Sequence, residues 1–282
     1  MARRRALSGY RGRIAPSPTG YMHLGHARTF WTAHERARAN NGILIFRNED
    51  IDPQRSKSEY ADAMIEDLRW LGIEWQEGPD VGGDFGPYVQ SQRRDWYLSV
   101  WRKLLEDGRI YPCTCSRKEL AEVAQAPHES NDEPLYPGKC RGNKNKDPKT
   151  PAGVNWRFQV PDGRTIHFND LRQGPQEFVA GRDFGDFVVW RRDDVPAYQL
   201  AVVADDAAMQ VTEVVRGMDL LKSAARQILL FEALGLRPPD YYHCELLTDE
   251  EGVRLAKRHD ALSLRQLRLR GLTPEQVRGM WR

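Results

Sequence analysis

The opening of the chain constrains its fold more than any other segment. Residues 11–15 are short and partly apolar, and Pro-Ser-Pro-Thr-Gly then forces a turn before residues 24–39, where helix-compatible residues dominate. Residues 42–46 contain an Ile-Leu-Ile run typical of a buried strand, and a helical stretch reaching Leu71 follows the polar turn that ends at Ser56. This order predicts a βαβα unit and therefore a parallel sheet with right-handed crossovers.

The middle of the chain interrupts this pattern. Residues 97–105 have apolar positions at helical spacing, after which Tyr111-Pro112 breaks the pattern and a polar segment runs from Cys113 to about Thr150. We interpret the polar segment as the start of an insertion. Further strands are expected at 156–160, 165–168, 184–190 and 210–215, and helices at 199–208, 220–234, 262–269 and from Thr273, where Pro274 suits the first helical position.

Length and composition limit the classes of protein to consider. The 282 residues exceed the usual length of about 150 residues per domain, so two domains or one large domain with an insertion are expected. The formal charge is only +2, far from the balance of a nonspecific nucleic-acid coat, and no DNA partner is expected. The three arginines near the N-terminus precede no apolar run, so we expect a cytoplasmic protein without a membrane span or secretory leader.

Two histidines lie at the first strand-to-helix junction, in His23-Leu24-Gly25-His26. Open α/β sheets bind nucleotides at such junctions, where helix N-terminal amides attract phosphate, and imidazoles there can offset charge on phosphate oxygens. Gly25 would let a ligand approach the backbone closely. The alternative is a pair of helix-start histidines beside structural prolines.

The longer context resembles a known family. Residues 13–29, RIAPSPTGYMHLGHART, resemble the first signature of glutamyl-tRNA synthetases, the "HIGH" segment of class I aminoacyl-tRNA synthetases. The resemblance implies an α/β fold with a Rossmann-like parallel-sheet nucleotide-binding domain that carries an insertion. It also implies ATP as a substrate with Mg²⁺, catalytic roles for His23 and His26, and ATP binding by these two residues with Gly25.

Within that fold we expect four segments along the chain. They are the first half of the catalytic domain at 9–108, an insertion at 109–194, the second half with the lysine loop at 195–260, and a short helical extension at 261–282.

A second segment, residues 46–55 (FRNEDIDPQR), resembles the family's Arg-x-Glu-Asp segment at the end of the next strand. The resemblance places Glu49 against the α-amino group of L-glutamate, which suits a carboxylate in a partly desolvated pocket. The alternative is a solvated acidic loop.

The family's glutamate pocket maps onto further positions of this sequence. By resemblance, Arg13, Ala15, Ser17, Tyr198 and Arg216 surround the amino acid with Glu49. A planar guanidinium pairs with a carboxylate through two hydrogen bonds, which a lysine cannot do. For Arg216, a plain surface arginine is the alternative.

The third class I signature, the mobile "KMSKS" loop, corresponds to residues 253–259, VRLAKRH. Lys257 matches the catalytic lysine, and Arg254 replaces the first lysine and keeps its charge near ATP. Ala256 replaces a serine, so one hydroxyl contact is lost. Taken alone, this stretch would be an ordinary basic loop.

Three cysteines, Cys113, Cys115 and Cys140, lie close together in sequence and indicate metal ligation more than disulfide bonding in a reducing compartment. Chemistry alone favours His128 as a fourth zinc ligand. Residues 111–117 and 135–141 resemble the Zn²⁺-bearing insertion of the glutamyl-Q tRNA(Asp) synthetase family, in which the tyrosine ligates, so we name Tyr136 first. Three free thiols without metal are the alternative.

The resemblance covers residues 11–259, and only 260–282 remain where full-length glutamyl-tRNA synthetases continue into an anticodon-reading domain. We therefore expect a glutamyl-Q tRNA(Asp) synthetase, a family that attaches glutamate to queuosine at the wobble position of tRNA(Asp). Arg141, Lys144 and Lys146 are candidates to flank the anticodon loop, or simply a solvated face. The alternatives are a truncated synthetase that charges a tRNA 3′ end and a non-catalytic module that binds RNA or a partner.

Overall fold

The computed structural model describes the chain except residues 1–8, 117–118, 120–134, 144–149, 248–262 and 282. It divides into two compact units. The first comprises Met1–Gln92, Ala208–Leu220 and Pro239–Arg282, and the second comprises Arg93–Ala207 and Leu221–Pro238. The boundaries expected at 109, 195 and 261 remain predictions.

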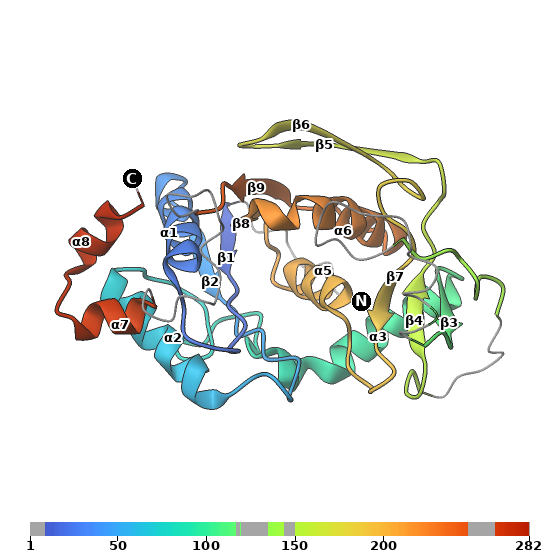
Figure 1. Cartoon of the computed structure of the whole chain (residues 1–282), viewed down its shortest axis with the longest axis horizontal. Coiled ribbons are helices and arrows are strands. Elements are labelled where there is room, and N and C mark those ends of the chain that lie inside the picture. The colour runs from blue at the N-terminus through green and yellow to red at the C-terminus, as the bar shows by residue number, and fades with distance from the viewer. Residues whose placement is uncertain (1–8, 117–118, 120–134, 144–149, 248–262, 282) are drawn as a thin grey trace. The chain divides into compact units, whose positions relative to one another are not determined.

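The first unit is built on parallel strands, as the opening of the sequence predicts (Figure 1). Strand β1 (Arg11–Ile14) pairs in parallel with β2 (Ile43–Phe46), and β8 (Glu213–Gly217) pairs in parallel with β9 (Asp240–Cys244). Helix α1 (Leu24–Ala39) connects β1 to β2 and packs against β1, β2 and β8.

Strand β8 runs beside β1. The Thr212 backbone N–H donates to Arg11 O at 2.9 Å, and two residues farther along, the Arg13 side chain reaches Val215 O. These contacts advance in the same direction on both strands, so β8 is parallel to β1. The carboxyl ends of β1, β2 and β8 therefore lie at the same edge of the sheet.

The core of the first unit forms where α1 and α2 (Ser58–Leu71) cover the strands. Helix α2 ends at Gly72, whose φ of 92° is the left-handed conformation that glycine adopts without strain. Gly42 is required for a different reason, because a Cβ there would lie 2.5 Å from Tyr10 O. The apolar residues of this core cluster that have no exposed surface are Ile14, Ala27, Leu68, Leu71, Leu264 and Val277.

Two short helices expected near the C-terminus are present, α7 (Leu264–Leu269) and α8 (Pro274–Gly279). Thr273 and Gln276 form a reciprocal capping box, with Pro274 at the first position of the helix. Helix α7 packs against α2, so this segment belongs to the first unit's core.

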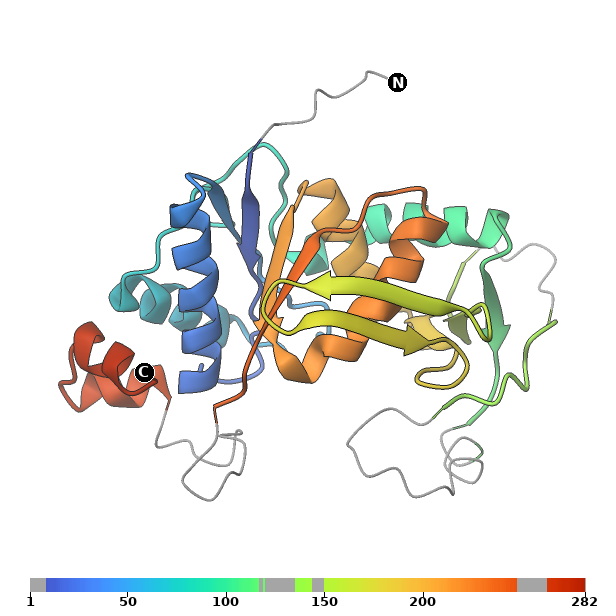
Figure 2. The ribbon, with the colours of Figure 1, turned by 90° about the horizontal axis from the view of Figure 1, so that it is seen from above.

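The second unit contains an antiparallel sheet in the order β3-β4-β7 and a second antiparallel pair, β5 with β6, drawn in yellow-green in Figure 2. The strands are β3 (Ile110–Cys113), β4 (Asn155–Phe158), β5 (Thr165–Asp170), β6 (Gly174–Val179) and β7 (Phe187–Trp190). The helices are α3 (Arg94–Glu106), α5 (Tyr198–Ala208) and α6 (Leu221–Ala233). Two short 3₁₀ turns lie at the boundaries between the units, η1 (Gln90–Arg93) and η2 (Met218–Leu220), and η2 belongs to the first unit.

Tryptophans and one buried carboxylate hold the second unit together. Trp101 of α3 meets Trp156 of β4 edge to face, with ring centroids 5.0 Å apart. Asp205 of α5 is fully buried and accepts from Arg93 Nε at 2.7 Å and from Tyr97 Oη at 2.8 Å. These contacts join α3 to the sheet and to α5.

Three strands were not expected, and the bounds of several others differ, since the strand expected at 156–160 ends at Phe158 and the one expected at 210–215 spans Glu213–Gly217. Strand β3 contains Pro112, which indicated a break, but β3 is an edge strand and tolerates a residue without an N–H. Strand β6 has no fully buried residue and so shows no apolar signal, and β9 contains a buried histidine. The strand expected at 184–190 begins only at Phe187.

Among the described residues, no helix combines the length and apolar character that a membrane crossing requires.

Asp67 makes the stability of the first unit depend on pH. Burial raises the pKa of this α2 carboxyl from 3.8 to about 6, although Arg265 and Arg268 act to lower it. The folded state therefore favours the protonated form. This stabilisation is fully present below pH 3.8 and is lost as the pH rises through about 6.

We expect Asp67→Asn to remove this dependence, because the amide stays neutral. Relative to the variant, the unchanged protein should lose up to about 3 kcal/mol of unfolding free energy between pH 4 and pH 7. Urea denaturation at both pH values measures the difference. Asp62→Asn, at an exposed position of the same helix, is the control and should leave the slope unchanged. An Asp67→Asn protein that keeps the full slope would refute this assignment.

Candidate functional site

Three ionic side chains lie at or just beyond the carboxyl ends of the parallel strands in the first unit. Arg13 is on β1, Glu49 follows β2, and Arg216 is on β8. All three are buried, with 4%, 8% and 4% of their surface exposed. In open α/β sheets this edge is where ligands bind.

Backbone carbonyl groups of β8 and of the loop after β1 hold Arg13 and Glu49. The Arg13 Nη1 donates to Val215 O at 3.2 Å, so its guanidinium lies against β8. The backbone N–H of Glu49 donates to Pro16 O at 3.0 Å, which ties Glu49 to the loop that contains half-buried Ala15 and exposed Ser17.

Arg216 is oriented by two neighbours on β9. Its Nε donates to Nε2 of His243 at 3.0 Å, so that nitrogen must be unprotonated to accept. The guanidinium also lies 5.2 Å from the centroid of the Tyr241 ring. His243 has no exposed surface, and the Arg216 head group is therefore fixed from the side of β9.

His23 and His26 meet at the start of α1. His23 is the N-cap of the helix, and its Nδ1 accepts from the Gly25 N–H at 3.1 Å. The two imidazole rings stack with centroids 3.9 Å apart. His23 therefore caps the helix structurally, while exposed His26 presents its ring beside it.

The predicted lysine loop falls outside the described residues, which include neither Arg254, Ala256 nor Lys257. The chain that follows it returns to the histidines, because Ser263 forms an isolated β-bridge with His23 and the Leu264 N–H donates to Met22 O at 2.8 Å.

Tyr198 is the first residue of α5 and belongs to the second unit, with 37% of its surface exposed. Its role beside Arg13, Glu49 and Arg216 remains a prediction.

The second unit gathers the three cysteines that the sequence singled out. The sulfur atoms of Cys113, Cys115 and Cys140 all lie within 4.8 Å of one another, and all three residues are buried. Tyr136 Oη lies 3.4 Å from Cys113 Sγ and 3.6 Å from Cys115 Sγ. Cys115 and Cys140 place their sulfurs 3.5 Å apart, close to the roughly 3.8 Å edge of a tetrahedron with 2.3 Å zinc–sulfur bonds.

The electrostatics of the cluster fit a set of metal ligands. Burial raises the pKa of the Cys115 thiol and of the Tyr136 phenol. Burial alone would also raise the pKa of Cys140, but hydrogen bonds with Tyr136 and the Thr114 backbone bring it down to about 7. A cation would stabilise all of these groups in their charged forms. The cluster can therefore hold a metal ion.

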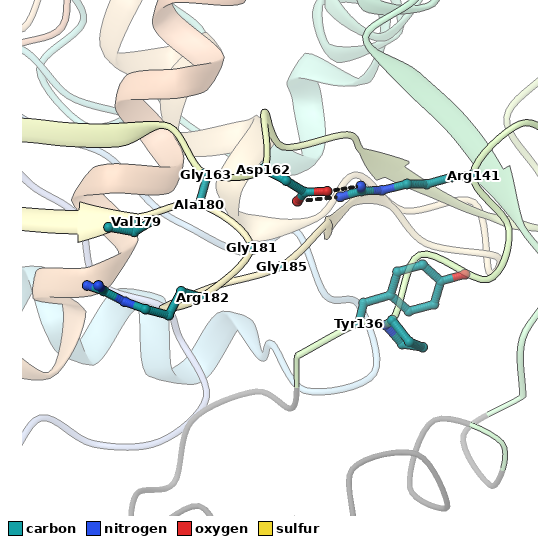
Figure 3. A pocket seen from close by; sticks show the side chains of 10 residues that line it. Tyr136, Arg141, Asp162, Gly163, Val179, Ala180, Gly181, Arg182 and Gly185 are labelled. Carbon is teal, nitrogen blue, oxygen red and sulfur yellow. Dashed lines mark hydrogen bonds and ion pairs between the residues drawn. The ribbon is translucent and has the colours of Figure 1, made fainter.

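The Cys140 loop is attached to the strands by Arg141. Its guanidinium is paired with Asp162, as Figure 3 shows, and donates to both carboxylate oxygens of Asp186 at 2.6 and 2.7 Å. The hydrogen bonds from Arg141 hold the pKa of Asp162 below its usual range. Asp186 also accepts a hydrogen bond from Oη of Tyr111, which lies on β3, the strand that contains Cys113.

These contacts border a pocket of about 390 Å³ beside the cysteine cluster. Gly185 is needed here, since a Cβ would lie 3.0 Å from the Tyr136 backbone nitrogen. The pocket is lined by Tyr136, Pro137, Arg141, Asp162, Gly163, Val179, Ala180, Gly181, Arg182 and Gly185 (Figure 3). Arg141, a candidate RNA contact, thus pairs with the carboxylates of Asp162 and Asp186. The other candidates, His128 for the metal and Lys144 and Lys146 for RNA, lie outside the described residues.

Sequence reasoning missed the two residues that hold the ionic groups, Arg47 and His243. A usable signal existed, because side chains two residues apart on an extended chain share a face. Arg47 precedes Glu49 by that spacing, whereas His243 lies 27 residues after Arg216 and no short spacing connects the two.

Comparisons with known proteins identify relatives of this chain. A glutamyl-Q tRNA(Asp) synthetase of Symbiobacterium thermophilum is 50% identical over 276 residues, which cover 95% of this chain and 84% of that protein. A glutamate–tRNA ligase 2 of Nitrosococcus oceani is 45% identical, over 94% of this chain and 57% of that protein.

Among solved structures, the glutamate–tRNA synthetase of Elizabethkingia anophelis matches with a TM-score of 0.76 and 30% identity, over 89% of this chain and 53% of that chain. The chain thus spans about half the length of these two ligases. The family model of class I tRNA synthetases (E and Q), catalytic domain, matches residues 10–280. This chain therefore belongs to the class I tRNA synthetase family for glutamate and glutamine, through its catalytic domain.

Proposed function

We propose that this protein activates L-glutamate with ATP and transfers it to the queuosine base of tRNA(Asp). The observation that carries the proposal is the buried trio of Arg13, Glu49 and Arg216 at the strand ends. It places two cations and one anion where an amino acid with two carboxylates would bind. The relative at 50% identity bears the name of this activity.

Charge complementarity assigns the glutamate contacts. Glu49 would accept hydrogen bonds from the α-ammonium group, while Arg13 and Arg216 would pair with the carboxylates through planar guanidinium groups. Ala15 and Ser17 would border the amino acid from the loop after β1, and Tyr198 would complete the pocket. Such charged hydrogen bonds are strong in a buried site.

Activation joins the glutamate carboxylate to AMP. A carboxylate oxygen attacks the α-phosphorus of ATP, and the bond from that phosphorus to the bridging oxygen breaks to release pyrophosphate. His23 and His26 would stabilise the charge that develops on the phosphates, with Gly25 allowing close approach, and Arg254 and Lys257 would do so from the lysine loop. Mg²⁺ would arrive bound to the phosphate oxygens of ATP.

Transfer then uses the mixed anhydride of glutamyl-adenylate. A hydroxyl oxygen of the queuosine ring attacks the acyl carbon, AMP leaves, and the hydroxyl proton is lost. The wobble base of an anticodon loop is accessible to such an attack because the loop is single-stranded. A cytoplasmic location belongs to the same proposal, and the four cysteines are free thiols, as a reducing compartment would keep them.

The cysteine cluster would hold Zn²⁺ through Cys113, Cys115, Cys140 and Tyr136. Its donor set suits tetrahedral zinc, and all four groups are protein ligands, which is typical of a structural rather than a catalytic site. The ion would fix the loop between β3 and β4.

A second candidate function is charging of a tRNA 3′ end with glutamate. The 45% identity to a glutamate–tRNA ligase favours it, since both activities need the same adenylate.

The accepting RNA distinguishes the two functions. We expect labelled glutamate to be transferred to tRNA(Asp) that carries queuosine, and not to unmodified tRNA(Asp) or to tRNA(Glu). Filter-bound radioactivity after incubation with ATP measures the transfer. Transfer to tRNA(Glu) alone would support the second candidate, and a protein without glutamate-dependent exchange of pyrophosphate into ATP would be a binding module.

Arg216→Lys tests the glutamate pocket. A lysine keeps the charge but loses the planar fork, so the KM for glutamate should rise about 10- to 100-fold while the KM for ATP stays the same. Pyrophosphate exchange gives both constants. Arg36→Lys is the control, because Arg36 pairs with Glu213 at the opposite end of β8 and should leave both KM values unchanged. Equal loss in both variants would contradict the assignment.

Variants of the cluster test the metal and its fourth ligand. We expect about one zinc ion per purified chain of the unchanged protein. Cys140→Ser should retain little zinc and have a lower Tm, and Tyr136→Phe should bind zinc at least about tenfold more weakly. Elemental analysis and competition with a chelator measure these effects. Cys244→Ser, also a buried free cysteine, should keep its zinc. Weaker binding after His128→Ala, but not after Tyr136→Phe, would show that the histidine is the ligand.

A further inference from the structure

Arg47 is a buried arginine for which the proposed chemistry has no direct use. It follows β2, has no exposed surface, and its backbone N–H donates to Ile14 O at 2.9 Å. Its side chain turns toward Glu49, with Nη2 at 2.9 Å and Nε at 3.3 Å from the same oxygen, Oε1. Two nitrogens of the guanidinium thus hold one oxygen of the carboxylate, while Nη1 lies 3.8 Å from Met209 Sδ.

Stability alone does not explain a pair like this. Moving two charges out of water costs several kcal/mol per ion, and apolar replacements of buried ion pairs are often neutral or stabilising. The pair does fix a geometry. The Glu49 backbone is bonded to Pro16 O, and its side chain is bonded to Arg47, so main chain and carboxylate are both held in place.

We propose that Arg47 is a positioning residue that aims the Glu49 carboxylate at the α-ammonium group of the amino acid and keeps it ionised. This inference rests on the proposed glutamate site. It predicts a specific role, because Arg47 acts on the ammonium contact alone and leaves recognition of the substrate carboxylates to Arg13 and Arg216.

The matched control is a second buried arginine–glutamate pair in the same unit. Arg11 of β1 is 2% exposed, and its Nη2 lies 2.9 Å from Glu77 Oε2. Arg11→Met and Arg47→Met each take the arginine from a buried carboxylate, and Glu77 keeps a hydrogen bond from Tyr88 Oη at 2.6 Å. Only Arg47 contacts a proposed substrate-binding residue.

The test compares L-glutamate with glutarate, the dicarboxylate that lacks the ammonium group. In Arg47→Met the KM for glutamate in pyrophosphate exchange should rise at least about tenfold, with the KM for ATP and the inhibition constant of glutarate within about threefold of the unchanged protein. Arg47→Lys should restore part of the loss. Arg11→Met should leave all three constants unchanged, whatever its Tm.

A double variant shows whether Arg47 acts through Glu49. In a Glu49→Gln background, adding Arg47→Met should change the KM for glutamate by less than about twofold, because the group it positions is already neutral. Equal losses for glutamate and glutarate, or fully additive effects, would overturn the inference. Calorimetric binding of glutamate without ATP gives the same comparison if Arg47→Met activates too slowly. Absence of exchange in the unchanged protein would instead refute the proposed function.

Discussion

Burial of charge at the strand ends is the requirement on which the rest of the first unit depends. Arg13, Glu49 and Arg216 are each at most 8% exposed, and an ionised group removed from water is tolerated only when it is hydrogen-bonded. Arg13 and Arg216 find partners on neighbouring strands, Val215 O of β8 and His243 of β9, while Glu49 is bound by Arg47, two residues earlier in the chain. The sheet must therefore be assembled before these groups have a defined geometry, and an assembled sheet leaves them little freedom to move.

In the second unit, the loops that carry the cysteines have few apolar side chains to bury. The loops around Cys113, Cys115 and Cys140 are polar and supply few apolar side chains, so a cluster of thiols takes the place of a core. Arg141 connects that cluster to the strands through Asp162 and Asp186, and Asp186 also binds Tyr111. An ion in the cluster would thus stabilise a network of charges that already reaches β3 and the turn before β7.

Local signals explain which elements the sequence predicted well. The helix expected at 24–39 is present with those bounds, because prolines and a capping histidine mark its start and Asn40 its end. The strands expected at 11–15 and 42–46 are present as 11–14 and 43–46, because turn residues follow the first and the second is an apolar run. Strand β9 was missed because His243 faces inward and accepts a hydrogen bond from Arg216, which no local pattern of apolar residues reports.

The sequence by itself determined the family, the parallel α/β opening, and the identity of the cysteines and ionic residues, because these depend on residue type and short spacing. Tertiary structure alone decided what holds those residues in place. Arg216 is bound by a histidine 27 positions later, and the histidine junction is bridged by Ser263 from the far end of the chain. Such partners are set by strand order and packing, and the physical reason is that a hydrogen bond depends on distance in space, which sequence separation does not encode.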